Sequence, residues 1–242
     1  MFKPCAIIPI YNHCLKIEEI VDYFCAQALP CFLLDDGSNK ECAEVLKKLG
    51  HLNGVELIRW DENRGKGAVV CDGLKRVYES GFTHALQIDA DGQHDLNDIE
   101  AMLALAQAFP EDVVSAARPY SEMPKSRRQG RKITDFWVWV NTLSGSIKDS
   151  MCGFRVYPLP NTYKLLSASN IGRRMDFDTD ILVRLYWQGV NVQHVPTSIR
   201  YDENNTSHFK MLADNVRISK MHTRLFFGML IRAPQLIARN FS

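Results

Sequence analysis

The sequence predicts an α/β fold in which a mostly parallel, doubly wound sheet carries helices on both faces. Short apolar runs alternate with amphipathic helical patterns through the first half of the 242-residue chain. Polar clusters follow four of these runs, at the strand ends where such sheets bind ligands. Hydrophobic residues make up 46% of the chain and charged residues 24%, which is typical of a globular rather than a disordered protein.

Five short apolar runs are predicted as buried strands of this sheet. They span Ala6–Ile10, Cys31–Leu34, Val55–Trp60, His84–Ile88 and Val113–Ala116. Between them the spacing of apolar residues predicts helices over Leu15–Ala28, Lys40–Leu49, Ala68–Ser80 and Leu96–Phe109. Because strands and helices alternate, we expect neighbouring strands to run parallel.

The regular alternation stops near Arg118. The second half is predicted to contain a basic loop, a helix over Ile133–Leu143, a glycine-containing turn at Cys152–Arg155, a helix over Asp178–Gln188, a strand over Val190–Val195 and a basic helical C-terminus. The sequence shows no repeat, low-complexity stretch or linker. We therefore expect one domain over residues 1–210, with an amphipathic helical extension of the same domain over residues 211–242.

The charge and cysteine content narrow the class of protein. With 29 basic and 28 acidic residues the net charge is +1, so a general nucleic-acid binder is not expected. The seven cysteines are odd in number and form no C-x-x-C pair, which favours buried free thiols in a reducing cytosol. No signal peptide and no apolar stretch of about 20 residues is visible, so a cytoplasmic protein that does not span the membrane is expected.

The strongest local signal is the pair Asp89 and Asp91, placed directly after a predicted strand. Two carboxylates at one strand end can bind a hard divalent cation such as Mg²⁺ together with substrate phosphates. The alternative is a helix start in which Asp95 caps the helix that follows. That alternative accounts for Asp95 and leaves Asp89 and Asp91 without a role.

Two further polar turns follow predicted strands. In Asp35–Ser38 a carboxylate can accept hydrogen bonds from a nucleobase or a ribose, although an Asx-type turn needs no ligand at all. Asn63–Gly67 is a glycine-bearing turn that opens a helix, where backbone N–H groups and Lys66 can meet phosphate. It lacks both the P-loop and the Rossmann glycine spacing, so neither an ATPase nor a dehydrogenase is indicated.

Together these residues resemble the family 2 glycosyltransferases of the GT-A fold, and most closely the dolichyl- and polyprenyl-phosphate sugar synthases. The match covers about the first 210 residues and its motifs occur in the expected order: Ile8–Asn12, Asp35–Ser38, Asn63–Gly67, Asp89–His94, Asp149–Arg155 and Arg200–Lys210. The resemblance implies an inverting transfer from a nucleotide sugar that depends on Mg²⁺ or Mn²⁺. The rival hypotheses are a nucleotidyltransferase on a related fold and a non-catalytic nucleotide-sugar-binding or membrane scaffold protein.

The resemblance also implies roles for individual residues. The residues expected to bind the donor nucleotide are Pro9, Tyr11, Asn12, Asp36, Lys66 and Asp89. The metal is expected at Asp89, Asp91 and Gln93. Catalytic roles are expected for Asp91, Asp149, Asp178 and Arg155. An acceptor hydroxyl would need a general base, for which Asp149 or the Asp176/Asp178/Asp180 group are candidates, whereas an acceptor phosphate is already anionic. Those three aspartates can equally cap and flank the following helix.

The segment from Arg118 to Lys132 carries a net charge of +5. In the resemblance it binds a lipid phosphate, through Arg118, Arg127, Arg128 and Arg131, with Arg200 and Ser207 contributing from a later segment. Arginine suits this role because its guanidinium fork binds phosphate bidentately. A solvated basic loop is the alternative. The aromatic residues in Phe136–Val140 favour a membrane interface, unless they belong to the core.

The C-terminal stretch Lys210–Ser242 combines basic residues with the apolar run Leu225–Ile231. It predicts an amphipathic helix pair on an anionic membrane surface, or one that packs on the catalytic domain or a partner. Relatives often carry true membrane helices here, and this chain departs from them. The expected partners are a nucleotide-sugar donor, a membrane-associated acceptor and an anionic membrane, with the protein peripheral on its cytoplasmic face.

Overall fold

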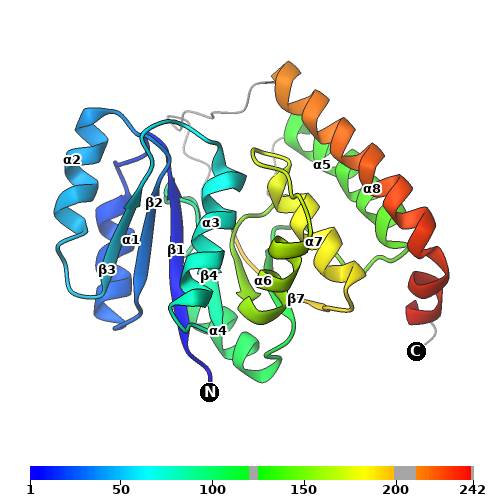
Figure 1. Ribbon diagram of the computed structural model, residues 1–242, viewed down its shortest axis with the longest axis horizontal. Helices are drawn as coiled ribbons and strands as arrows, with labels where there is room; N and C mark the ends of the chain where they lie inside the picture. The colour runs from blue at the N-terminus through cyan, green and yellow to red at the C-terminus, as the bar shows by residue number, and fades with distance from the viewer. Residues whose placement is uncertain (120–124, 199–210, 241–242) are drawn as a thin grey trace.

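The computed structural model describes residues 1–119, 125–198 and 211–240. Within these ranges seven strands form one sheet in the order β3-β2-β1-β4-β6-β5-β7, with helices packed against it (Figure 1). β6 runs antiparallel to both β4 and β5, and the other neighbouring strands run parallel. The mostly parallel sheet predicted from the alternation of apolar runs is confirmed.

The elements alternate regularly up to β5. The strands are β1 (Pro4–Ile10), β2 (Cys31–Asp35), β3 (Val55–Arg59), β4 (His84–Gln87), β5 (Val113–Ala117), β6 (Arg155–Pro158) and β7 (Val192–Pro196). The helices are α1 (Ile17–Ala26), α2 (Lys40–Leu49), α3 (Lys66–Glu79), α4 (Asp98–Ala108), α5 (Lys125–Thr142), α6 (Leu159–Ala168), α7 (Phe177–Trp187) and α8 (Met211–Asn240).

Each face of the sheet carries its own apolar core. Along β1, Ile7 packs with one cluster and Ile8 with the other, because successive side chains of a strand point to opposite faces. Helices α3, α6, α7 and α8 contribute to the first cluster, and α1, α2 and α4 to the second. The expectation of helices on both faces is therefore confirmed.

Two elements in the second half of the chain, β6 and α6, were not predicted. The expected turn at Cys152–Arg155 leads directly into a strand that was not predicted, because Arg155 is the first residue of β6. Helix α6 follows at once, with Pro160 in its first turn, and was not predicted either. A four-residue strand that begins with arginine has no apolar run to mark it. Its burial comes from β4 and β5 on either side.

Two helices replace what was expected as a loop and a helix pair. Helix α5 begins at Lys125, so much of the expected basic loop is helical. The C-terminal stretch is one helix of 30 residues rather than a pair, even though it contains Pro234. Leu225 and Met229 of α8 are buried in the core it shares with α7. The C-terminal helix therefore packs on the body of the protein.

The aromatic residues of α5 divide between the surface and the seam with α8. Phe136 and Trp139 are each 54% exposed, whereas Val138 between them is buried. The Trp137 ring stacks on His222 of α8, with 6.1 Å between the ring centroids. The core alternative for this segment therefore holds for Val138 and not for Phe136 or Trp139.

Candidate active site

Several polar clusters singled out in the sequence meet at the carboxyl ends of β1, β2 and β4. Ile10 at the end of β1 pairs with Asp35 at the end of β2. The backbone N–H of Asp36 donates to the carbonyl of Ile10 over 2.8 Å, and that of Ile88 donates to the carbonyl of Ile7 over 3.2 Å. The parallel register thus brings residues distant in sequence to one edge of the sheet.

Asp36 ties the end of β2 to the turn that opens α3. Its carboxylate accepts hydrogen bonds from the backbone N–H of Arg64 (2.6 Å), that of Gly65 (2.9 Å) and the side-chain amide of Asn63 (2.9 Å). The residue is only 2% exposed, and this burial raises the pKa of its carboxyl despite the hydrogen bonds. Asp36 was expected to bind the nucleotide; the structure places it behind the turn, where it holds the turn in position.

Asn12 joins the ends of β1 and β2 in a similar way. It adopts a left-handed backbone with φ of 56°. Its N–H donates to Ser38 Oγ over 3.0 Å, and its Oδ1 accepts from the N–H of Asn39 over 2.8 Å. Pro9 and Tyr11 are both half-buried beside it. These residues form a rigid rim at the site.

Lys66 lies between two carboxylates that come from opposite sides of the site. Its Nζ is 2.7 Å from Asp89 Oδ1 and 3.2 Å from Asp178 Oδ2 of α7. Burial alone would lower the pKa of this ammonium, but the charges of Asp178 and Asp89 outweigh it and hold the pKa above its usual value. The sequence interpretation placed Lys66 toward phosphate; the structure adds that it links α3 to β4 and α7.

Two residues of this cluster were missed in the sequence. Gln87, at the end of β4, donates to Asp178 Oδ1 over 3.4 Å, and its buried Oε1 has no hydrogen-bond partner among the described residues. A Cβ at Gly153 would lie 2.7 Å from Lys66 Nζ and 2.9 Å from Gln87 Nε2. Gly153 was seen only as a turn residue; its lack of a side chain is what lets the cluster close.

Asp91 has the surroundings of a cation ligand. Burial, and then the charge of Asp89, raise the pKa of Asp91 to about 6. Its Oδ1 accepts from the N–H of Gln93 over 3.1 Å. The neighbouring His94 packs its ring on Phe154, and burial lowers the pKa of this imidazole to about 4. Two repelling carboxylates beside an amide suit a hard cation that is completed by substrate oxygens.

A cation site of that open kind remains a prediction for these residues. The described ranges contain no group of three or more His, Cys, Asp or Glu side chains that could hold a metal ion on its own. The Lys66 ammonium lies on Asp89 in this structure. The helix-start alternative explains neither carboxylate, because Asp95 accepts from the N–H of Asn97 (3.0 Å) ahead of α4 and Asp89 and Asp91 take no part in that turn.

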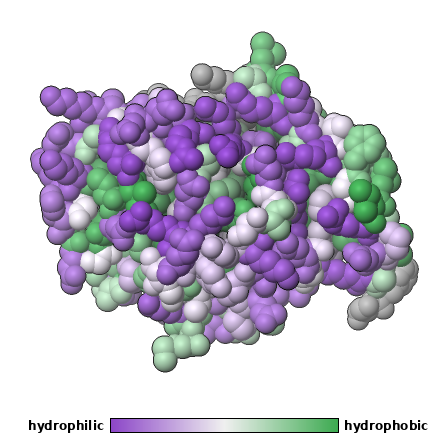
Figure 2. Space-filling view, viewed as in Figure 1, coloured by the Kyte–Doolittle hydropathy of each residue, from purple (hydrophilic) through white to green (hydrophobic). Residues whose placement is uncertain are grey.

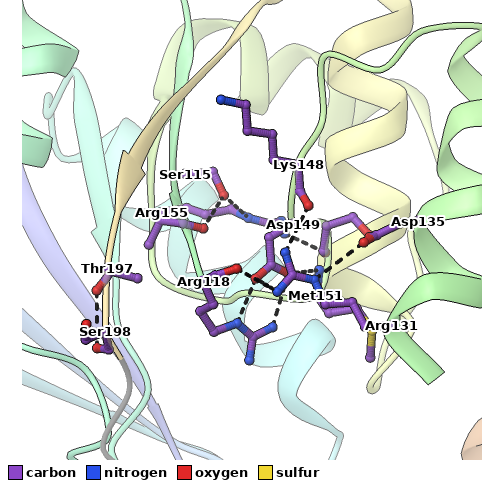
Figure 3. A network of polar contacts seen from close by, with 12 residues as sticks. Ser115, Arg118, Arg131, Asp135, Lys148, Asp149, Met151, Arg155, Thr197 and Ser198 are labelled. Carbon is purple, nitrogen blue, oxygen red and sulfur yellow. Dashed lines mark hydrogen bonds and ion pairs between the residues drawn. The ribbon is translucent and has the colours of Figure 1, made fainter. Parts of the chain in front are cut away.

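Asp149 binds two of the arginines expected to contact an acceptor phosphate (Figure 3). Arg118 donates to it through Nε (2.7 Å) and Nη2 (3.1 Å), and Arg131 Nη1 lies 3.4 Å from its Oδ2. Asp149 is fully buried, and burial alone would raise the pKa of its carboxyl. The hydrogen bond and charge of Arg118, with the charge of Arg131, outweigh burial and hold that pKa below its usual value.

Arg155 was expected to be catalytic, and the structure places it away from the open site. Its side chain is fully buried and donates to the carbonyls of Ser150 and Asp178 and to the hydroxyl of Ser115. It therefore braces the Asp149 turn against the start of α7. Asp178 faces Lys66, as described above, so its carboxylate belongs to the site.

The other two aspartates near α7 serve structure. Asp180 is fully buried and binds Arg184 over 2.6 Å, Arg224 of α8 and the N–H of Gly172. Asp176 accepts from the N–H of Arg174 over 3.1 Å. The flanking interpretation therefore fits these two residues.

Some predicted residues cannot be compared with the structure. Arg200 and Ser207 lie outside the described residues, as does the side chain of Arg127. Arg128 is half-buried on α5. The structure thus brings Asp89, Asp178 and Lys66 together, sets Arg118 and Arg131 on Asp149, and encloses Asp36 and Arg155.

Comparison with known proteins adds independent findings. The family described as "Glycosyl transferase family 2" matches residues 5–172. The chain is 26% identical to a UDP-N-acetylglucosamine–dolichyl-phosphate N-acetylglucosaminyltransferase of Methanococcus voltae over 217 residues, which cover 81% of this chain and 85% of that protein. It is 27% identical over 201 residues to a dolichyl-phosphate beta-glucosyltransferase of Drosophila melanogaster, covering 73% and 60%.

Among solved structures, the chain resembles glucosyl-3-phosphoglycerate synthase from Mycobacterium tuberculosis in complex with Mn²⁺, UDP and phosphoglyceric acid. The TM-score is 0.69 at 11% identity, over 94% of this chain and 78% of that one. The same enzyme with Mg²⁺ and UDP gives a TM-score of 0.68. This likeness confirms the fold class predicted from the sequence.

Proposed function

The chain belongs to glycosyl transferase family 2, and from this premise we propose that it transfers a sugar from a UDP-sugar to a polyprenyl-type lipid phosphate. One observation carries the proposal. The carboxylate pair Asp89 and Asp91 lies within electrostatic reach of Arg118, which Asp149 holds: against the effect of burial, the charge of Lys66 and, more weakly, that of Arg118 keep the pKa of Asp89 below its usual value. A site for a metal-bound diphosphate thus adjoins a site for a second anion.

The donor proposal rests on the relatives together with the site chemistry. The Methanococcus relative is named for UDP-N-acetylglucosamine, and the solved structures contain UDP with Mn²⁺ or Mg²⁺. Asp89, Asp91 and Gln93 would hold the metal in this chain. When bound, the metal supplies positive charge to the diphosphate leaving group. Lys66 pairs with Asp89 and Asp178 and so holds α7 against the turn Asn63–Gly67, which we call the donor turn.

The acceptor proposal rests on the names of two relatives and on the arginines around Asp149. Both curated relatives are named for dolichyl phosphate. A phosphate oxygen already carries negative charge, so it attacks the anomeric carbon while the bond from that carbon to the diphosphate breaks and UDP leaves. One such displacement inverts the anomeric centre and needs no general base. Arg118 orients the acceptor phosphate, since guanidinium groups bind phosphate oxygens bidentately. Arg131 is buried and donates to the backbone carbonyls of Arg118 and Lys148, so it holds Arg118 in position.

The surface of α8 supports a membrane-associated acceptor. Five of its residues are basic and Asp214 is its single acid; the basic residues are Arg217, Lys220, Arg224, Arg232 and Arg239. Figure 2 shows hydrophobic side chains gathered over this helix, where Phe227 and Ile231 are 61% and 81% exposed. Basic and apolar groups on one helix suit the surface of an anionic membrane.

The mode of membrane contact follows from two further observations. In the part of the chain that the structure describes, no helix has the length and apolar character needed to cross a membrane. All seven cysteines lie in that part and are free, four of them buried, although Cys25 is exposed against expectation. Free thiols fit a reducing compartment. We therefore place the protein peripherally on the cytoplasmic face of a membrane.

The direct test is a transfer assay on vesicles that carry a short polyprenyl phosphate. UDP-N-acetylglucosamine, UDP-glucose and GDP-mannose are offered with Mn²⁺ or with EDTA, and the labelled lipid and released nucleotide are measured. We expect transfer from a UDP-sugar only with metal, together with co-sedimentation with anionic vesicles at low salt. Because salt screens charges, co-sedimentation should weaken between roughly 0.05 and 0.5 M salt.

Two results would contradict the proposal. Binding of UDP-sugar without turnover on any lipid phosphate would indicate the non-catalytic scaffold. In a parallel reaction that offers a nucleoside triphosphate and a sugar 1-phosphate, release of pyrophosphate would indicate a nucleotidyltransferase. Equal activity on a soluble short-chain phosphate, without any vesicle binding, would remove the membrane part alone.

A glycine substitution tests whether the Lys66 cluster is part of the machinery. In Gly153→Ala the new Cβ would press on Lys66 Nζ and Gln87 Nε2, which are flexible ends that can shift. Because misplacement of site groups by about 1 Å can cost about 10²-fold in rate, we expect kcat/KM to fall roughly 10- to 100-fold. The melting temperature should fall by only a few degrees, as for modest overpacking.

Gly145→Ala is the matched control for that experiment, because a Cβ at Gly145 meets nothing within 4 Å. It should retain full activity. A Gly153→Ala enzyme with the kcat/KM of the unmodified protein would show that the cluster tolerates displacement, and the role proposed for Lys66 would be wrong.

A further inference from the structure

Arg174 contacts the donor turn although it lies more than 100 residues further along the chain. It lies between α6 and α7, in a segment whose Arg173 carbonyl accepts a hydrogen bond from the N–H of Ala68 over 3.0 Å. Gly65, at φ of 97°, leaves room for it: a Cβ there would lie 2.6 Å from Arg174 Cγ. The stem of Arg174 therefore lies across the first residues of α3.

The guanidinium of Arg174 joins the Asp36 network and stays accessible. Its Nη1 donates to Asn63 Oδ1 over 3.0 Å, and Asn63 in turn donates to Asp36. Burial raises the pKa of Asp36, and the charge of Arg174 opposes part of that rise together with the backbone hydrogen bonds of the turn. Arg174 is exposed, and this is the one side-chain hydrogen bond it makes with the described residues. A guanidinium has five N–H donors, so several remain for a ligand.

The position of Arg174 corresponds to the nucleoside half of the donor. Asp89 and Asp91, proposed for the metal and diphosphate, follow β4, whereas Asp36 follows β2, and β1 lies between these strands. Neighbouring strands lie about 4.8 Å apart, so the two positions are separated by about 10 Å. A diphosphate held at the end of β4 therefore places its nucleoside toward the end of β2.

We propose that Arg174 is a donor-specificity residue that donates a hydrogen bond to an acceptor oxygen of the nucleoside, either a base carbonyl or a ribose hydroxyl. The inference rests on the proposed function. Asp36, the residue expected to recognise the nucleotide, already accepts three hydrogen bonds from the turn that opens α3. Arg174 presents donors at the same place, and Asn63 orients them.

The test compares nucleotide binding by calorimetry in the presence of Mn²⁺. Arg174→Ala is expected to weaken UDP roughly 10- to 100-fold, the usual range for a hydrogen bond from a charged group. Inorganic pyrophosphate, which has no nucleoside, should bind both proteins alike. Arg173→Ala removes the same charge one residue away and serves as the control. Both substitutions are at exposed positions, so both proteins should melt close to the unmodified chain.

Two further ligands identify the oxygen. If the partner is the C4 carbonyl of the base, CDP binding should respond less than UDP binding to Arg174→Ala, because cytosine carries an amino group at C4; an equal response of CDP and UDP would point to the C2 carbonyl or to the ribose. If it is a ribose hydroxyl, 2′-deoxy-UDP should respond less. Either result supports the proposal.

Three results would overturn the assignment: unchanged UDP affinity, an equal loss of pyrophosphate affinity, or an equal effect of Arg173→Ala. Each leaves the proposed function standing. An unmodified protein that binds no nucleoside diphosphate would instead contradict the proposed function itself.

Discussion

An Asp91→Asn protein is expected to transfer sugar about 10²- to 10³-fold more slowly than the unmodified protein, the range seen when one preorganised charge-stabilising group is removed. Asp91 lies beside Asp89 and is buried enough for its pKa to rise to about 6, so the pair holds concentrated negative charge. Asparagine keeps the size and one oxygen but removes that charge. The cation then loses its main attraction, and the leaving diphosphate loses the cation.

The measurement pairs turnover with metal binding. Mn²⁺ affinity in the presence of UDP is read by electron paramagnetic resonance, independently of activity. Asp95→Asn is the matched control, because Asp95 lies four residues further on and uses its Oδ1 only to accept from Asn97. We expect the control to bind and turn over normally. Unchanged Mn²⁺ affinity in Asp91→Asn would refute the metal role of this residue.

The position of the candidate site at one edge of the sheet could be predicted from the sequence, for a physical reason. Parallel strands carry their carboxyl ends to one edge, so the polar residues after Ile10, Leu34 and Ile88 had to meet there once those runs were strands. Strand alternation is a local property and is readable without the structure. This is why the sheet agrees with expectation and why the polar turns that follow its strands lie at one edge.

Partners that approach from distant elements were not predictable in the same way. Asp36 has the pattern of a ligand residue in the sequence, but its role depends on how the turn after β3 returns to it. Arg155 is part of the motif that carries the family resemblance and yet is fully buried under Asp178. Whether a polar side chain faces substrate or backbone depends on packing between elements, which local spacing does not encode.

Arg174 and Gly153 illustrate the same limit from the other side. Neither residue belongs to a polar cluster that follows a predicted strand. Arg174 contacts Asn63 of the donor turn and Gly153 lies against Lys66, and in each case the two residues are about 90 to 110 positions apart in the sequence. A glycine that packs a cluster gives no chemical signal at all. Only the three-dimensional arrangement identifies these residues.

Asp149→Asn should raise KM for the lipid phosphate roughly 10- to 100-fold, because Arg118 and Arg131 lose the carboxylate that orients them. The same change should lower the free energy of unfolding by about 3 kcal/mol, because it removes the buried negative charge that compensates the two arginines. As a general base, Asp149 would instead be needed in the chemical step, and its loss would lower kcat by about 10²- to 10⁴-fold with little change in KM.

The geometry around Asp149 favours the positioning role. Asp149 is fully buried, three arginine nitrogens lie on its carboxylate and its pKa is depressed, so it is a weak base. Asp112→Asn, at a buried aspartate bound by Gln193 over 2.8 Å, controls for the loss of a buried carboxylate elsewhere. A fall in kcat at unchanged KM, with loss of the acidic limb of the pH–rate profile, would assign Asp149 to proton transfer. A rise in KM with an unaltered pH profile would show that Asp149 positions Arg118 for the acceptor.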